Sequence, residues 1–162
     1  MLKEKIQQDL SKFLKEGNEM ALSVLRMLTA AIQDKEKKKR YLFSSQGLSG
    51  DQLTTASYLS EEEILKIVSS EMKKRKESIN AFEKAGRKDR VMREKEEADM
   101  LAKYLPKQIS LEELSIIVKK AIEEIGVRDI KDLGKVMSKV MPLVKGKADG
   151  TEVERLAKDM LS

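Results

Sequence analysis

The sequence contains no histidine, no cysteine and no tryptophan, and only two of its 162 residues are proline. Without cysteine the chain forms no disulfides and uses no thiolate chemistry. Without histidine it lacks the commonest metal ligand and the usual general base near neutral pH. Zinc sites built on these residues and Ser-His or Cys-His nucleophilic systems are therefore excluded. We identify no catalytic, cofactor-binding or metal-binding residue.

Long apolar runs are also absent, and none approaches the roughly 20 residues that span a bilayer. The first residues, Met1 to Asp9, are amphipathic and carry acidic side chains, unlike a signal or transit peptide. We therefore expect a cytoplasmic protein without a membrane partner. The organellar matrix is the alternative if a presequence has been removed.

Charged residues make up 38% of the chain and aromatic residues only 4%. An ordinary domain has roughly 25% charged residues. Glu, Lys, Leu, Met and Ala dominate, and these residues favour helices over strands. The composition predicts an all-α fold. The net charge of +5, from 33 basic and 28 acidic residues, is compatible with an RNA partner but does not identify one.

The apolar spacing predicts an N-terminal helical domain over residues 1–108 with four helices. Gly17-Asn18 separates the first two helices, and a capping box of Ser60 and Glu63 begins the third. Residues 88–104 are predicted to form an exposed connecting helix. Residues 40–60 contain two glycines and many hydroxyl side chains without a sustained period, which favours a loop insertion.

Residues 109–162 are predicted to form a C-terminal domain of three helices. A capping box of Ser110 and Glu113 begins the first helix, and Gly126 ends it. The second helix runs from about Lys131 until Pro142 limits it. The third begins after Asp149, whose side chain can cap it.

Three motifs of this second half resemble the signature of the GatB/YqeY family: Lys131-Asp-Leu-Gly-Lys-Val-Met137, Met141-Pro142 and Lys145-Gly-Lys-Ala-Asp-Gly150. The stretches Glu71–Ser78, Phe82–Arg87 and Tyr104–Gln108 resemble the free-standing YqeY-like branch. The resemblance covers nearly the whole chain. Residues 40–60 depart from the family pattern.

The resemblance implies an all-α fold whose three-helix C-terminal domain is similar to the tail of the B subunit of the tRNA-dependent amidotransferase. In that enzyme the tail is associated with handling the tRNA. The family is also associated with carbon–nitrogen ligase activity with glutamine as the amide donor. The free-standing proteins, however, lack the catalytic body of the B subunit.

The segment Lys145–Gly150 has two interpretations. Gly146 and Gly150 allow unusual backbone conformations while Asp149 caps a helix, which is a purely structural role. Alternatively, Lys145 and Lys147 lie beside a helix N-terminus, where they could hold an RNA phosphate. Spacing alone favours the structural role, and the resemblance to a tRNA-handling tail raises the second to equal weight.

Gly134 lies inside a predicted helix, where glycine costs about 1 kcal/mol relative to alanine. Close approach of another helix is the favoured explanation. Lys131, Lys135 and Lys139 recur every four residues, as in a basic stripe or a solvated helix face. The basic run Lys35–Arg40 is interpreted as a solvated helix end. Together with the second basic run, Lys73–Lys76, it could instead widen an RNA footprint, but without interleaved aromatics neither run is expected to recognise bases.

The clustered acids, Glu61 to Glu63 and Glu94 to Glu97, are interpreted as caps and helix surface rather than as acid–base pairs. The acids thus indicate no catalytic site, and the family resemblance implies a non-catalytic protein that binds the tRNA backbone, an amidotransferase or a tRNA synthetase. An accessory role in glutamine-dependent carbon–nitrogen ligation and a pure protein-interaction module are the alternatives. The candidate residues are Lys131, Gly134, Lys135, Lys145, Gly146, Lys147, Asp149 and Gly150.

Overall fold

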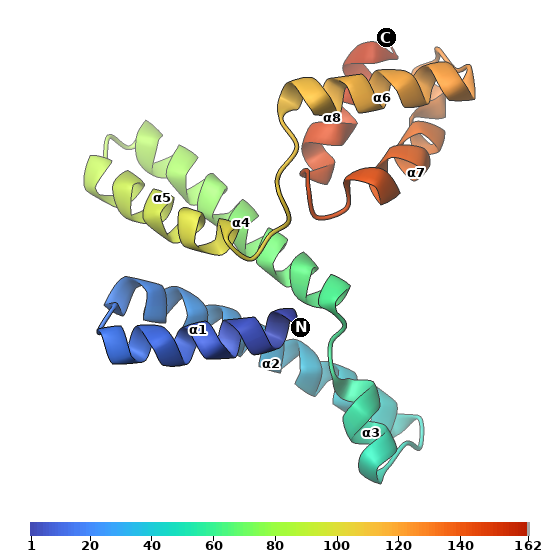
Figure 1. Ribbon diagram of the computed structural model, residues 1–162. Coiled ribbons are helices and arrows are strands. Elements are labelled where there is room, and N and C mark those ends of the chain that lie inside the picture. Colours follow the sequence, from blue (N-terminus) through green and yellow to red (C-terminus); the bar gives the residue numbers. More distant parts are fainter. Residues whose placement is uncertain (162) are drawn as a thin grey trace. The chain divides into compact units, whose positions relative to one another are not determined.

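The computed structural model describes residues 1–161, which form helices joined by short turns (Figure 1). The described residues contain no strand, so the all-α prediction is confirmed. The chain divides into two compact units, the first ending at Tyr104 and the second beginning at Leu105. No helix among the described residues combines the length and apolarity needed to cross a membrane.

The first unit has five α-helices rather than the four predicted: α1 (Leu2–Glu16), α2 (Glu19–Ser45), α3 (Gly50–Ser57), α4 (Glu61–Lys84) and α5 (Lys88–Ala102). The predicted turn between α1 and α2 is confirmed. Gly17 has a φ of 68°, and the Asn18 side chain accepts a hydrogen bond from the Ala21 amide at 3.0 Å. The capping box of Ser60 and Glu63 at the start of α4 is confirmed as well.

The predicted loop at 40–60 is wrong, because α2 continues to Ser45 and α3 occupies Gly50–Ser57. α3 packs against α2 (Figure 1) and buries Leu53, leaving only 8% of this residue exposed. The glycine and hydroxyl residues of α3 have low helix propensity, so the composition does not predict this helix. Tertiary packing against α2 stabilises it.

Ion pairs hold the end of this α2–α3 excursion against the rest of the unit. The Lys3 ammonium lies 2.7 Å from the Glu36 carboxylate, which also accepts the Leu59 amide at 3.2 Å. Lys39 donates to the Tyr58 carbonyl at 3.0 Å and pairs with Glu63 at 3.0 Å. Carboxylates on α2 and α4 therefore fix the chain where it leaves α3.

α5 is not the exposed connecting helix predicted from its charge. It packs along α4, and Glu97, Met100 and Leu101 are 6%, 3% and 0% exposed. The Arg75 guanidinium on α4 lies 2.7 Å from Glu97 and 3.0 Å from Glu94. One cation thus compensates two partly buried carboxylates, so part of the charge of α5 belongs to the interior of the unit.

The second unit contains α6 (Leu111–Ile125), a 3₁₀ turn (Ile130–Asp132), α7 (Leu133–Val144) and α8 (Gly150–Met160). Its predicted capping box at Ser110 and the left-handed Gly126 are confirmed. Valine and leucine side chains of all three helices form its core; Val118, Val136, Val140, Val144 and Val153 have no exposed surface. Pro142 does not stop α7, which continues to Val144, because it falls in the last turn, where only one helical hydrogen bond is lost.

Replacing Arg75 tests the internal ion cluster. We expect Arg75→Ala to lower the free energy of unfolding of the first unit by about 3 kcal/mol, because Glu94 would lose its cation and the buried Glu97 would keep only the more exposed Arg93. Urea unfolding followed by tyrosine fluorescence measures this unit alone, since Tyr41, Tyr58 and Tyr104 all lie in it.

The matched control is Lys95→Ala. Lys95 pairs with Glu83 at 3.1 Å, but the two side chains are 56% and 49% exposed. Removing such a surface pair costs less than about 1 kcal/mol. Equal losses for Arg75→Ala and Lys95→Ala would contradict the special role of the buried cluster.

Because of Tyr104, the free energy of unfolding of the first unit should fall as the pH rises into the alkaline range. Its side chain is buried, and its hydroxyl donates to the Asp9 carboxylate on α1 at 2.7 Å. Burial, and then the adjacent carboxylate, raise the pKa of Tyr104 above its ordinary value of 10. Above this pH the unfolded chain loses the proton while the folded chain keeps it. The stabilisation is therefore complete below pH 10 and is lost as the pH rises.

We expect the free energy of unfolding to fall, on account of Tyr104, by up to about 1.4 kcal/mol per pH unit in this alkaline range. Tyr104→Phe should remove this part of the slope, and at neutral pH it should cost about 1 kcal/mol through the lost hydrogen bond. Urea titrations between about pH 8 and pH 11 measure both effects. Identical slopes for the two proteins would refute the assignment.

Candidate functional site

The turn between α7 and α8 carries the candidate residues Lys145 to Gly150. Gly146 has a φ of 72°, and a Cβ atom there would lie 3.4 Å from Cγ of Pro106. A Cβ on Gly150 would lie 3.4 Å from the terminal methyl of Met141. Gly146 is thus required by its left-handed backbone, and a second segment, at Pro106, lies within ordinary contact distance of it.

That second segment is the stretch before α6. The Ile109 amide donates to the Lys147 carbonyl at 2.9 Å. The Gln108 side-chain amide donates to the Gly146 carbonyl at 3.0 Å and to the Pro106 carbonyl at 2.9 Å. Two motifs far apart in the sequence, Tyr104–Gln108 and Lys145–Gly150, are therefore bonded together. We call residues 106–109 with 145–150 the braced turn.

Three exposed lysines belong to the braced turn: Lys107, Lys145 and Lys147. Neither Lys107 nor Lys147 forms an ion pair with any described residue. Sequence reasoning missed Lys107 and Gln108 as site residues. The motif Tyr104–Gln108 marks this stretch in the sequence, but no neighbouring residue indicates that it contacts the turn between α7 and α8.

Asp149 performs the structural role predicted for it. Its carboxylate accepts the Thr151 amide at 2.8 Å, and its carbonyl accepts the Glu152 amide at 3.0 Å. The first amides of α8 are thus already bonded, and a carboxylate lies beside them. An anion near this helix start would be held by the lysine side chains rather than by the helix amides.

Lys131, Gly134 and Lys135 lie at the opposite end of α7. A helix of 12 residues is about 18 Å long, so these residues do not converge with the braced turn. Lys135 pairs with Asp132 at 2.7 Å, and Lys139 pairs with Glu124 at 2.6 Å. This end of α7 is a surface of mixed charge.

The expected close approach of another helix to Gly134 is wrong. A Cβ atom added there would meet nothing within 4 Å, because Gly134 lies on the exposed side of α7. Packing within the described residues therefore does not account for this glycine.

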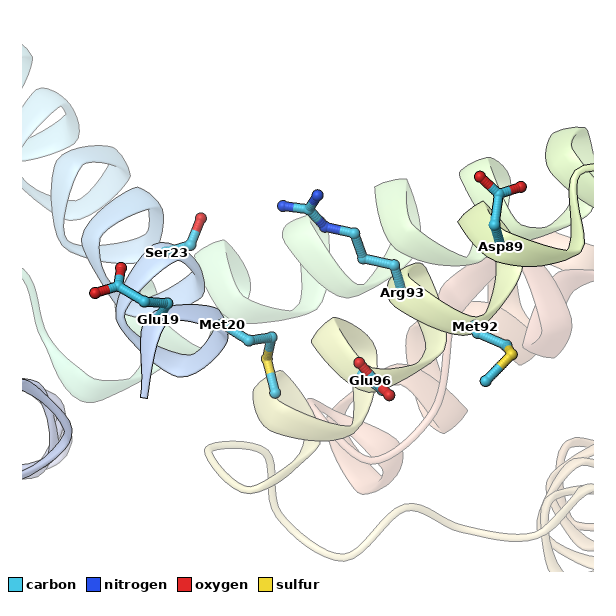
Figure 2. Close-up of a pocket in the computed structure, with 7 residues that line it drawn as sticks. All are labelled: Glu19, Met20, Ser23, Asp89, Met92, Arg93 and Glu96. Atoms are coloured by element: carbon cyan, nitrogen blue, oxygen red, sulfur yellow. The ribbon is translucent and has the colours of Figure 1, made fainter. Parts of the chain in front are cut away.

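A groove of about 680 Å³ lies between the start of α2 and α5 in the first unit. Figure 2 shows its lining residues, with Arg93 extending from α5 toward the α2 side: Glu19, Met20, Ser23, Asp89, Met92, Arg93 and Glu96. Arg93 is bonded to Glu97 at 3.1 Å. The hydrogen bond from Arg87 lowers the pKa of Asp89, so this carboxylate stays ionised. The groove is lined by three acidic side chains, and its one guanidinium, that of Arg93, already pairs with Glu97. The negative charge of these acids would repel a phosphate.

The contacts confirm the predicted capping role of Glu63, but the predicted surface role is wrong for Glu97, which is only 6% exposed. The hydrogen bond from the Ser60 amide, and then Lys39, lower the pKa of Glu63. Glu61 accepts the Leu2 amide at 2.8 Å, and Glu94 and Glu97 pair with Arg75. These carboxylates are ion-pair and hydrogen-bond partners that hold the first unit together.

Comparison with known proteins places the chain in a family. The model of the family described as Yqey-like protein matches residues 3–161, which include all the helices of both units except the first residue of α1, Leu2. The chain belongs to the YqeY-like family. No curated protein matches it. Both halves of the braced turn lie within the region that matches this family, so the hydrogen bonds from Gln108 and Ile109 join two parts of one YqeY-like chain.

Two glycines of this YqeY-like protein should respond oppositely to substitution. We expect Gly146→Ala to destabilise the second unit by about 1–2 kcal/mol, because alanine is strained at positive φ. Gly134→Ala, in open space on a helix, should stabilise it by about 0.5–1 kcal/mol. Thermal unfolding followed by far-ultraviolet circular dichroism compares them. A stabilised Gly146→Ala protein would show that the brace does not constrain the turn.

Proposed function

We propose that the second unit binds tRNA through its phosphate backbone, as a non-catalytic binding protein, with the braced turn as the principal contact. The observation that carries this proposal is the gathering of Lys107 and Lys147 around one rigid turn, where neither has a carboxylate partner among the described residues. Exposed cations that are not neutralised locally are the groups that release counterions on binding nucleic acid.

Phosphate contact fits the chemistry of this unit better than base recognition. From Leu105 onward the sequence has no phenylalanine, tyrosine or tryptophan, so no aromatic ring can stack on a base. Lysine contacts to phosphates position a nucleic acid without specifying its sequence. The unit is therefore suited to recognise the shape and charge of an RNA.

Transfer RNA is the favoured ligand because the C-terminal unit resembles the tail of the amidotransferase B subunit. Lys131 and Lys135, about 18 Å away at the other end of α7, would extend the footprint along the RNA backbone. An amidotransferase or a tRNA synthetase acting on the same tRNA is the matching protein partner.

A filter-binding titration with tRNA at several salt concentrations tests the proposal. Lys107→Ala/Lys147→Ala should weaken binding about tenfold near 0.1 M salt. It should also reduce the slope of log affinity against log salt by about 1.4–1.8, because two phosphate contacts are lost. The effect should be uniform across different tRNAs.

The charge-matched control is Lys119→Ala/Lys120→Ala on α6. Both lysines are exposed and form no ion pair with described residues, so net charge falls equally while the braced turn stays intact. Binding within about twofold of the original protein is expected. Equal weakening by both double variants, or no salt-dependent binding at all, would refute the proposal.

A further inference from the structure

The second half of α2 presents two different faces. Ile32, Glu36, Lys39 and Phe43 recur at helical spacing on the covered face, which meets α3 and the ion pairs described above. On another side of the helix, Gln33, Lys37 and Tyr41 follow one another every four residues and are exposed. We call this exposed face, with the flanking Arg40, the α2 stripe.

Tyr41 is the most exposed aromatic residue of the chain, with 80% of its surface accessible. The other two tyrosines have partners. Tyr58 lies under the Lys3 ammonium, 5.0 Å from the ring centre, and Tyr104 is buried against Asp9. α3 packs against the covered face, and Arg40 donates to the Thr54 hydroxyl at 3.4 Å. The Tyr41 ring is thus displayed on a supported helix rather than on a loose loop.

Positive charge is concentrated in the segment of α2 that leads to this ring. Residues 34–41 contain five cations and two carboxylates, and both carboxylates are already engaged. Asp34 pairs with Lys38 at 2.7 Å, and Glu36 pairs with Lys3. The hydrogen bond from Lys38 lowers the pKa of Asp34, and the charges of Lys37 and Lys35 add to this. Lys35 and Lys37 form no ion pair with any described residue.

An exposed ring on the same segment as cations that form no ion pair with described residues matches a single-stranded nucleic acid in two respects. An unpaired base stacks on an aromatic ring, and the flanking phosphates meet the cations. A duplex offers no free base to the ring, and the acidic groove at the start of α2 offers no phosphate site. The same chemistry explains why a tyrosine is left exposed on a helix whose other face is covered.

We propose that the α2 stripe binds single-stranded RNA, with Tyr41 stacking on a base while Lys37 and Arg40 contact the adjacent phosphates. The inference takes RNA as the ligand class from the proposed function of the second unit. It assigns a separate site, on the other unit, with a different recognition chemistry.

Fluorescence anisotropy with a short labelled oligouridine tests this site in the full-length protein. Tyr41→Ala should weaken binding about tenfold, because stacking contributes about 1–3 kcal/mol per base. Tyr41→Phe, which keeps the ring, should bind within about twofold of the original protein. Lys37→Ala should reduce the salt slope by about 0.7, the value for one contact to a single strand.

Two controls separate stacking from charge and from general damage. An abasic oligomer of equal length retains the phosphates but lacks the bases, so Tyr41→Ala should leave its binding unchanged. Tyr58→Ala removes the other exposed tyrosine and should leave oligouridine binding unchanged. Unaltered oligouridine binding by Tyr41→Ala, or an equal loss with the abasic oligomer, would overturn the proposal, as would no binding of oligouridine at all.

The same proteins distinguish failure here from failure of the proposed function. Lys107→Ala/Lys147→Ala should weaken tRNA binding but not oligouridine binding. If oligouridine does not bind while tRNA binding still depends on Lys107 and Lys147, only the α2 stripe is refuted. If oligouridine binding depends on Tyr41 while Lys107→Ala/Lys147→Ala leaves tRNA binding unchanged, only the proposed role of the braced turn is refuted.

Discussion

The backbone hydrogen bond from Ile109 to Lys147 is the constraint on which the second unit's surface depends. Together with the Gln108 bond to Gly146, it fixes a turn whose backbone only glycine adopts without strain. Pro106, with its locked φ, packs against that glycine. Lysine side chains displayed from such a scaffold still lose their own rotamer freedom on binding, but the backbone beneath them is already ordered.

The consequence of each charge in this protein depends on whether it has a partner. Arg75, Lys3 and Lys39 form ion pairs between segments and stabilise the first unit. Lys37, Lys107 and Lys147 form none with described residues, and they lie on surfaces supported by packing or hydrogen bonds. The net charge of +5 conceals this division, because most of the 33 cations are offset by the 28 acids. Location, rather than net charge, determines where a polyanion can bind.

Whether a feature of this protein can be predicted from its sequence depends on how far apart in the chain the interacting residues lie. The caps at Ser60, Ser110 and Gly126 were predicted because a cap is specified by residues within one turn. The helix α3 and the burial of α5 were missed because packing against α2 and α4 overrides local composition. The role of Gln108 was missed for the same reason, since its acceptor on Gly146 lies 38 residues away. The exposed position of Tyr41 on α2 was not predicted because residues 40–60 were taken as a loop insertion, whereas α2 continues to Ser45.

The two proposed surfaces have complementary chemistry. The second unit has no aromatic residue and is proposed to contact only the RNA backbone, whereas the stacking proposed for Tyr41 on the α2 stripe needs an unpaired base. Each surface alone supplies few contacts and is expected to bind weakly. Because one chain carries both, an RNA held by one surface meets the other at a high effective concentration wherever the geometry permits. A folded RNA with both a phosphate-lined helix and unpaired bases would then be favoured over a plain duplex or a plain single strand.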